Sequence, residues 1–262
     1  MSTFTTAALD ADALCLGPHW IYDQSQLEQA YPDGVHTITD PLSPYHPNRK
    51  AGQHTHLGDQ VRFLAESIAE HGSYCRDHWK QTWLEAVTNY DGYLDGATKS
   101  TFAAKAETPA NTNEFAVVSR IAPILDLDLP LEECLEAAQS QASLTHGGHL
   151  IPEAIAYFIR VVYRIKGGES ISAALLAEAE TTLYPQLQPT NSLHIAQNSD
   201  PSGFRSVAQK FGQACSLDSA FPLTLYFALH HSTDPATCLS NNALAGGDNT
   251  ARAMVLAILM AA

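Results

Sequence analysis

Polar residues whose types and spacing could do chemistry gather most clearly near the C-terminus. There Gly246-Gly247-Asp248-Asn249-Thr250 precedes an apolar run. Two glycines let a backbone come close to a ligand, and an acid at a helix start can bind a metal ion or orient a ligand. Asp248 is equally suited to cap the helix by accepting its first free N–H groups. These residues alone leave both interpretations open.

A second place combines histidines with an acid. In GQHTHLGDQ, His54, His56 and Asp59 stand just before an amphipathic segment. A His-x-His pair followed by an acid could supply metal ligands. Asp59 could instead be a first-turn acid that offsets the helix dipole.

Three further stretches place polar residues beside glycines or turns. A single histidine in such a stretch is more often a hydrogen-bonded structural residue than a ligand. The stretches are ALDADALCLGPHWIYD with Asp12, His19 and Trp20, YDGYLDGATK with Tyr93, Asp95 and Thr98, and SLTHGGHL with Thr145, His146 and His149.

The elements that must position these residues are helices. Val61, Leu64 and Ile68 lie on one face of a helix by their spacing, and the same spacing recurs in residues 155–162 and 251–259. No hairpin signal joins two strand-like runs. We therefore predict an all-α protein, a single-domain helical bundle over residues 1–262. Residues 39–53, 106–113 and 184–203 are rich in helix breakers and are predicted as loops.

Composition narrows the class of protein. The 28 acidic residues against 14 Lys and Arg give a net charge of −14, which disfavours nucleic acid as a partner. The five cysteines show no C-x-x-C pair, so we expect neither a disulfide framework nor a thiolate zinc site. No apolar run reaches the length of a membrane span and no signal peptide is indicated, so we expect a soluble cytoplasmic protein without a membrane partner.

Taken in order, these stretches resemble the ADP-ribosylglycohydrolase family. The resemblance rests on ADALCLGPHW, GDQ before VRFLAES, THGGHLIPEA and NNALAGGDNT. It implies an all-α fold and hydrolysis of an ADP-ribosyl bond at a pair of magnesium or manganese ions. Small-molecule or ADP-ribosylated substrates are the implied partners.

The family's acidic motifs are incomplete in this chain. Its Thr-Asp-Asp is matched to Leu57-Gly58-Asp59, and its Gly-Asp-Thr-Asp-Thr to residues 247–251, where Thr250 replaces the second acid. A glutamate seven residues beyond the first Asp is matched by His19. Two magnesium ions need several carboxylates to offset their repulsion. We therefore expect at most one weakly bound magnesium or manganese ion, with a histidine-bound transition metal as the alternative.

The resemblance assigns roles to individual residues. Asp59 or His19 would activate water, and the metal ligands would be Asp59, Asp248 and Thr250. Two functions stay open, a divergent hydrolase of ADP-ribosyl or related glycosidic bonds and a catalytically inactive binder of a nucleotide or sugar, while a purely structural role is disfavoured by the retained acids. The substrate-binding residues would be Asp12, Tyr93, His146, Gly246, Gly247, Asn249 and Arg252.

Overall fold

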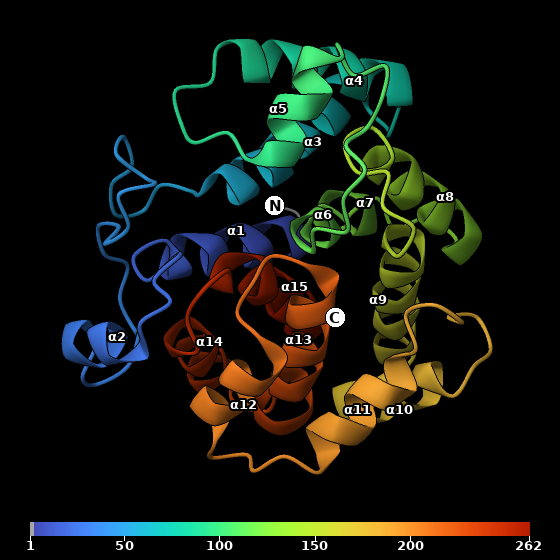
Figure 1. Ribbon diagram of the computed structural model, residues 1–262. Helices are drawn as coiled ribbons and strands as arrows, with labels where there is room; N and C mark the ends of the chain where they lie inside the picture. The colour runs from blue at the N-terminus through green and yellow to red at the C-terminus, as the bar shows by residue number, and fades with distance from the viewer. Residues whose placement is uncertain (1–2) are drawn as a thin grey trace.

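The chain folds into helices joined by turns and irregular segments (Figure 1). The structure is a computed structural model and describes residues 3–262. Within that range the only β pairing is two isolated bridges, so the predicted all-α class is confirmed. The helices are α1 Thr3–Cys15, α2 Gln24–Ala30, α3 His56–His71, α4 Arg76–Thr88, α5 Gly96–Ala103, α6 Ala116–Ser119, α7 Ala122–Leu125, α8 Leu131–Ala142, α9 Ile151–Lys166, α10 Ile171–Ala179, α11 Pro189–Gln197, α12 Phe204–Phe211, α13 Leu217–His231, α14 Pro235–Leu244 and α15 Asn249–Ala261.

The last helix, α15, forms the centre of the fold. Its residues 249–259 are all buried, because other helices cover it on every side. Helix α1 packs along α15, and α13 and α14 also contact it (Figure 1). Ala8 and Ala11 of α1 and Ala251 of α15 are fully or almost fully buried, and such small side chains let helices approach closely. This packing brings the Asp248 end of α15 beside the end of α1.

The periodic segments form helices as predicted. Helix α3 begins at the cap residue Thr55, whose side chain accepts hydrogen bonds from two backbone N–H groups, and it ends at Gly72 in the left-handed conformation. Helix α9 buries its apolar face and carries Arg164 and Lys166 in its last turn, where positive charge complements the helix dipole. Both helices bury the faces that the sequence indicated.

One predicted loop is wrong in part. Residues 39–53 and 106–113 contain no helix, but the segment 184–203 contains α11. Pro189 stands in the first turn of α11, where its missing N–H costs no hydrogen bond. Leu193 and Ala196 are buried against the core and hold this short helix in place. The tertiary contacts therefore outweighed the local breakers.

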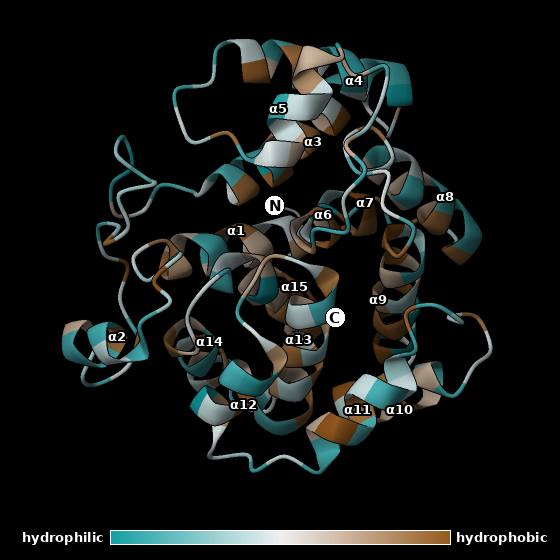
Figure 2. Cartoon of the chain, in the orientation of Figure 1, coloured by the Kyte–Doolittle hydropathy of each residue, from teal (hydrophilic) through white to brown (hydrophobic). Residues whose placement is uncertain are grey.

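Hydropathy varies between the helices. Figure 2 shows hydrophobic residues along much of α9 and hydrophilic residues along α2. Among residues 3–262, no helix is both long enough and apolar enough to cross a membrane.

Candidate functional site

The two glycines before Asp248 form a turn that packs against the chain's own backbone. Gly246 and Gly247 have positive φ angles of 81° and 67°. A Cβ on Gly247 would lie 2.1 Å from the carbonyl oxygen of Gln213, and one on Gly246 would lie 2.7 Å from that of Ile21. Glycine is therefore required by internal packing. Close approach of a ligand, which the sequence suggested, is not needed to explain these residues.

Asp248 occupies the cap position of α15 but its side chain points elsewhere. Within the described chain, that side chain makes no capping hydrogen bond. Its Oδ1 lies 3.0 Å from Nε2 of His19, and Nδ1 of His19 lies 2.9 Å from Nε2 of His46. An ionised carboxylate only accepts, so a neutral His19 donates to Asp248 and accepts at Nδ1 from His46. The three side chains form one buried hydrogen-bonded line, which we call the Asp248–His46 line.

Burial sets the protonation states along this line. It raises the pKa of Asp248 to about 6, although Arg252 opposes the rise. It lowers the pKa of His46 to about 3, and the neighbouring His19 adds to that effect. Burial also holds the pKa of His19 well below its ordinary value. The two imidazoles are therefore neutral at neutral pH.

His56 is the residue of α3 that lies nearest to this line. Its ring centre is 6.2 Å from that of His19 and 6.4 Å from that of His46. Its Nε2 lies 3.7 Å from Oδ2 of Asp95, the cap residue of α5. Burial lowers the pKa of His56, while Asp95 and then Asp248 favour its charged form. His56 thus connects the start of α3 with Asp95 and Asp248.

Aromatic side chains gather over the three imidazoles. Trp20 stacks on His19 at 4.6 Å between ring centres, and Tyr93 and Tyr45 approach Trp20 edge-on at 4.9 and 5.5 Å. We call these three residues the aromatic cluster. Trp20 has a φ of 60°, which is costly for a bulky side chain. Tyr45 is 54% exposed, and Trp20 and Tyr93 are partly exposed, so solvent reaches the cluster.

An exposed cysteine borders the aromatic cluster. The pKa of Tyr93 is raised by burial first, and Asp95, Tyr45, Glu114 and Cys215 add to the effect. Cys215 also lies within electrostatic range of Asp248. Its side chain is exposed, whereas three of the other cysteines are buried.

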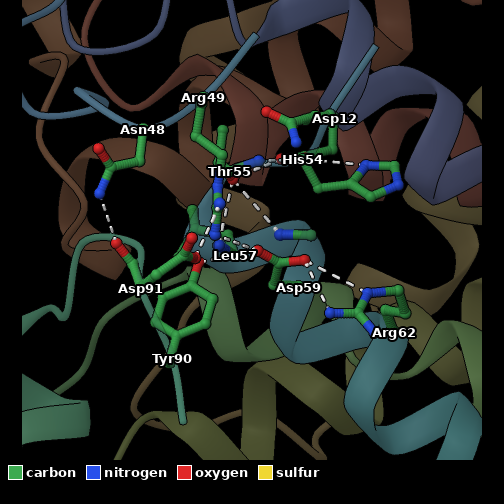
Figure 3. Close-up of polar contacts among 12 residues, drawn as sticks. Asp12, Asn48, Arg49, His54, Thr55, Leu57, Asp59, Arg62, Tyr90 and Asp91 are labelled. Carbon is green, nitrogen blue, oxygen red and sulfur yellow. Dashed lines mark hydrogen bonds and ion pairs between the residues drawn. The ribbon is translucent and has the colours of Figure 1, made fainter. Parts of the chain in front are cut away.

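The side chain of Asp59 contacts two arginines and a tyrosine (Figure 3). Its Oδ2 accepts from Nη2 of Arg49 at 2.9 Å and from the hydroxyl of Tyr90 at 2.8 Å. Its Oδ1 accepts from Nε and Nη2 of Arg62 at 3.3 and 3.2 Å. Arg49 also bonds to Asp91 at 3.1 Å. All these side chains line one surface hollow, which the aromatic cluster does not line.

Asp12 is fully buried and is held by the start of α3. Its two oxygens accept from N and Oγ1 of Thr55 at 2.8 and 2.6 Å. His54 Nδ1 lies 3.4 Å from the same carboxylate (Figure 3). A Cβ on Gly58 would lie 2.2 Å from Asp12 Oδ2. Asp12 therefore fixes the cap of α3, and its carboxylate fills the space beside Gly58.

The remaining residues of the C-terminal motif point into the protein. Arg252 donates from Nε to Asn242 and from Nη2 to the carbonyl of Gly246, both at 2.8 Å. Asn249 donates to the carbonyl of Ala243 at 3.3 Å. Thr250 is fully buried, and among residues 3–262 its hydroxyl has no hydrogen-bond partner. Arg252 and Asn249 therefore hold the turn between α14 and α15.

His146 belongs to a small polar cavity beneath α5. The cavity has a volume of about 20 Å³, enough for one or two water molecules. Asp95 and Arg120 also line it, and His146 Nδ1 lies 2.8 Å from the hydroxyl of Thr145. Asp95, which contacts both His56 and this cavity, connects it to the imidazoles.

The structure brings together only part of the set inferred from sequence. His19 and Asp248 are in contact, and Tyr93 packs against Trp20, which stacks on His19. Asp12 and Asp59 have separate partners. His46 and Arg49 were missed, because both stand in an irregular loop whose sequence gives no periodic signal. His56 was noted with His54 as a possible metal ligand but was not included among the expected catalytic or substrate-binding residues.

The arrangement of side chains that could bind a metal ion is a further feature of the site. In the part of the chain that the structure describes, no group of three His, Cys, Asp or Glu side chains is arranged to hold a metal ion. Asp248 Oδ2 and His56 Nδ1 are buried and lack hydrogen-bond partners within residues 3–262.

Comparisons with known proteins identify the family. The solved structure described as "ADP-ribosylglycohydrolase-related protein complex" is 18% identical and superposes with a TM-score of 0.67, covering 99% of this chain and 85% of that one. At that identity it shows the fold alone. No curated protein sequence matches this chain. The sequence model described as ADP-ribosylglycohydrolase matches residues 7–262. The chain therefore belongs to the ADP-ribosylglycohydrolase family.

Proposed function

We propose that this protein binds an ADP-ribosyl or related nucleotide-sugar ligand at the aromatic cluster. One observation carries the proposal: partly exposed aromatic rings lie directly over buried polar groups. Trp20 and Tyr93 offer ring faces and edges on which a nucleobase can stack. Beneath them, Asp248 Oδ2 and His56 Nδ1 are buried without partners in residues 3–262, so ligand hydroxyls would satisfy them.

Tryptophan fluorescence tests this proposal directly. The chain has three tryptophans, and Trp79 and Trp83 are fully buried. Stacking of adenine would therefore change the emission of Trp20. We expect saturable quenching by ADP-ribose, and Tyr93→Ala should weaken the apparent affinity by roughly tenfold, as for loss of one stacking contact. Leu183→Ala, which truncates an exposed side chain elsewhere, is the matched control.

A second measurement locates the ligand. Cys215 is exposed and lies within electrostatic range of Tyr93 and Asp248, so bound ADP-ribose should slow its reaction with a thiol reagent. A Cys75→Ser background removes the other accessible thiol. The proposal is wrong if millimolar ADP-ribose neither quenches Trp20 nor protects Cys215.

Hydrolysis is a second candidate, favoured by the Asp248–His46 line. A carboxyl group with a pKa of about 6 can accept a proton near neutral pH. Water would add to the anomeric carbon and pass its proton to Asp248. The glycosidic bond would break with its electron pair on the leaving group, which would take a proton from solvent water. Asp59 has no role in this step, because its oxygens already accept from Arg49, Arg62 and Tyr90.

Release of ADP-ribose from an ADP-ribosylated protein separates the two candidates. If the protein is a hydrolase, Asp248→Asn should lower the rate by roughly a hundredfold or more, the usual contribution of acid–base catalysis. If it only binds, the wild type should show no turnover while it still quenches with ADP-ribose.

A further inference from the structure

Members of this family are typically metal-dependent, so each acid of this site can be tested as a metal ligand. A magnesium ion needs oxygen ligands with free lone pairs and a surplus of negative charge. Two such ions close together need several carboxylates. The contacts of Asp12, Asp59 and Asp248 show whether these acids meet that need.

The carboxylate of Asp12 is already hydrogen-bonded within the protein. Both of its oxygens accept hydrogen bonds from Thr55, and Oδ2 also faces His54 at 3.4 Å. Because this carboxylate lies 2.2 Å from a Cβ position on Gly58, no side chain can be added at 58 without moving it. An acid at position 58 would therefore have to displace the Asp12 carboxylate from its place beside Thr55.

Asp59 is surrounded by positive charge. Arg49 and Arg62 bring two guanidinium groups onto one carboxylate, and Tyr90 adds a third donor (Figure 3). A metal ion here would have to displace these donors and would be repelled by both arginines. Asp59 is thus the anchor of an arginine pair rather than a free ligand.

The start of α3 suggests which residues replace the family's acids. The family motif begins with threonine, and the threonine that caps α3 is Thr55. If the family's Thr-Asp-Asp is aligned with Thr55-His56-Leu57, then His56 and Leu57 take the positions of the two acids. This alignment begins two residues before the one made from sequence, which begins at Leu57. His56 does lie beside Asp95 and within electrostatic range of Asp248, as a residue of the site should. Both acids of that motif are then lost.

Within residues 3–262, one carboxylate oxygen of Asp248 has no hydrogen-bond partner, but the side chains next to it are imidazoles. Its Oδ1 is bonded to His19, which stands where many members carry a glutamate. His56 is its neighbour on the α3 side. Asp95, whose oxygens accept from Thr98, is the further acid within electrostatic range of Asp248, and Asp12 and Glu114 lie within electrostatic range of His56. Two divalent ions would carry four positive charges into this environment.

We infer that this protein binds its ligand without the family's pair of metal ions, and that His19 and His56 stand in the places of two acids of the family's motifs. Nδ1 of His56, which has no hydrogen-bond partner within residues 3–262, then meets a polar group of the ligand in place of a metal ion. The statement about metals stands on the contacts above, and the statement about the ligand rests on the proposed function.

Metal titration of the wild-type protein is the first test. We expect calorimetry with Mg²⁺ and with Mn²⁺ to show no site tighter than roughly 1 mM, the weak end of protein cation sites. Two sites with dissociation constants in the micromolar range would overturn the inference. This measurement needs no variant, so it decides the question whatever the variants do.

Ligand binding with and without chelator is the second test. ADP-ribose quenching of Trp20 should keep the same dissociation constant in EDTA and in Mg²⁺. Quenching that appears only with Mg²⁺ overturns the inference but keeps the proposed function. If ADP-ribose does not bind under either condition, the proposed function fails, and the metal titration still decides the inference.

Two double variants test the assignment of positions. His56→Asp/Leu57→Asp should create a site at which Mg²⁺ raises the melting temperature. Leu57→Thr/Gly58→Asp, which follows the alignment made from sequence, should not create such a site, because the side chain added at position 58 meets Asp12. A larger Mg²⁺ effect in the second variant would contradict the places given to His56 and Leu57, and circular dichroism checks that both variants are folded.

Discussion

The raised pKa of Asp248 makes a specific prediction about stability. Burial raises this pKa from its ordinary value of 3.8 to about 6. The folded protein therefore holds the Asp248 proton more tightly than the unfolded chain does. The free energy of unfolding falls as the pH rises from about 4 to about 6, because the buried carboxyl must ionise. A difference of about 2 in pKa corresponds to about 3 kcal/mol.

Asp248→Asn removes this ionisation and keeps an oxygen that can accept from His19. The variant should therefore gain about 3 kcal/mol relative to the wild type between about pH 4 and about pH 7. Contributions of the buried histidines are shared by both proteins and largely cancel in the difference.

Urea unfolding followed by circular dichroism measures this difference at several pH values. The same substitution at the exposed Asp10 gives the background of an Asp→Asn change. The reasoning would be refuted by a difference between Asp248→Asn and wild type that does not change with pH, or that shrinks as the pH rises.

Three further predictions follow from buried groups. Because the pKa of His46 is about 3 in the folded protein and 6.5 ordinarily, its contribution to stability is present above pH 6.5 and is lost as the pH falls toward 3. His46→Gln should thus lower the number of protons taken up on acid unfolding by about one, as measured by the pH dependence of urea unfolding. Gly247→Ala should lower the free energy of unfolding by well over the roughly 1 kcal/mol expected for Gly52→Ala. Both glycines have positive φ, but of the two only a Cβ on Gly247 would meet another atom. Urea unfolding compares the two variants. Arg252→Met should cost roughly 3 kcal/mol in the same assay, because the Gly246 carbonyl and Asn242 lose a buried donor.

The helices were predictable because their signal is local. The spacing of Val61, Leu64 and Ile68 is a property of one segment, and burial of that face follows wherever the helix packs. Helix α11 was missed because its proline and polar residues are breakers locally. Its stability comes from burial of Leu193 and Ala196, which involves distant parts of the chain.

The site was harder to predict because hydrogen-bond partners are not encoded by spacing. His19 and Asp248 are 229 residues apart in sequence and 3.0 Å apart in space. The family resemblance named both residues but could not show that they bond to each other. His46 lies in an irregular loop, and Leu42 of that loop is held by a backbone hydrogen bond to Gly17. Such a loop has no periodicity from which its path could be derived.

Asp12, Asp59 and Asp248 each accept a hydrogen bond from a side chain of this protein. A buried carboxylate without a partner costs several kcal/mol, so an acid left behind by a lost metal ion would destabilise the fold. Asp248 has His19, Asp12 has Thr55, and Asp59 has two arginines. A new carboxylate placed beside one of these acids without a new donor should therefore be costly.

His19→Glu tests this expectation. The new carboxyl would lie about as close to Asp248 as the imidazole does now, and two carboxyl groups in contact share one proton. The variant should be destabilised relative to His19→Gln, whose amide can still donate to Asp248. That loss should grow as the pH rises from about 5 to about 8, because the shared proton becomes harder to keep. Urea unfolding at both pH values measures it. Equal stability of the two variants at the higher pH would show that Asp248 does not depend on a donor at position 19.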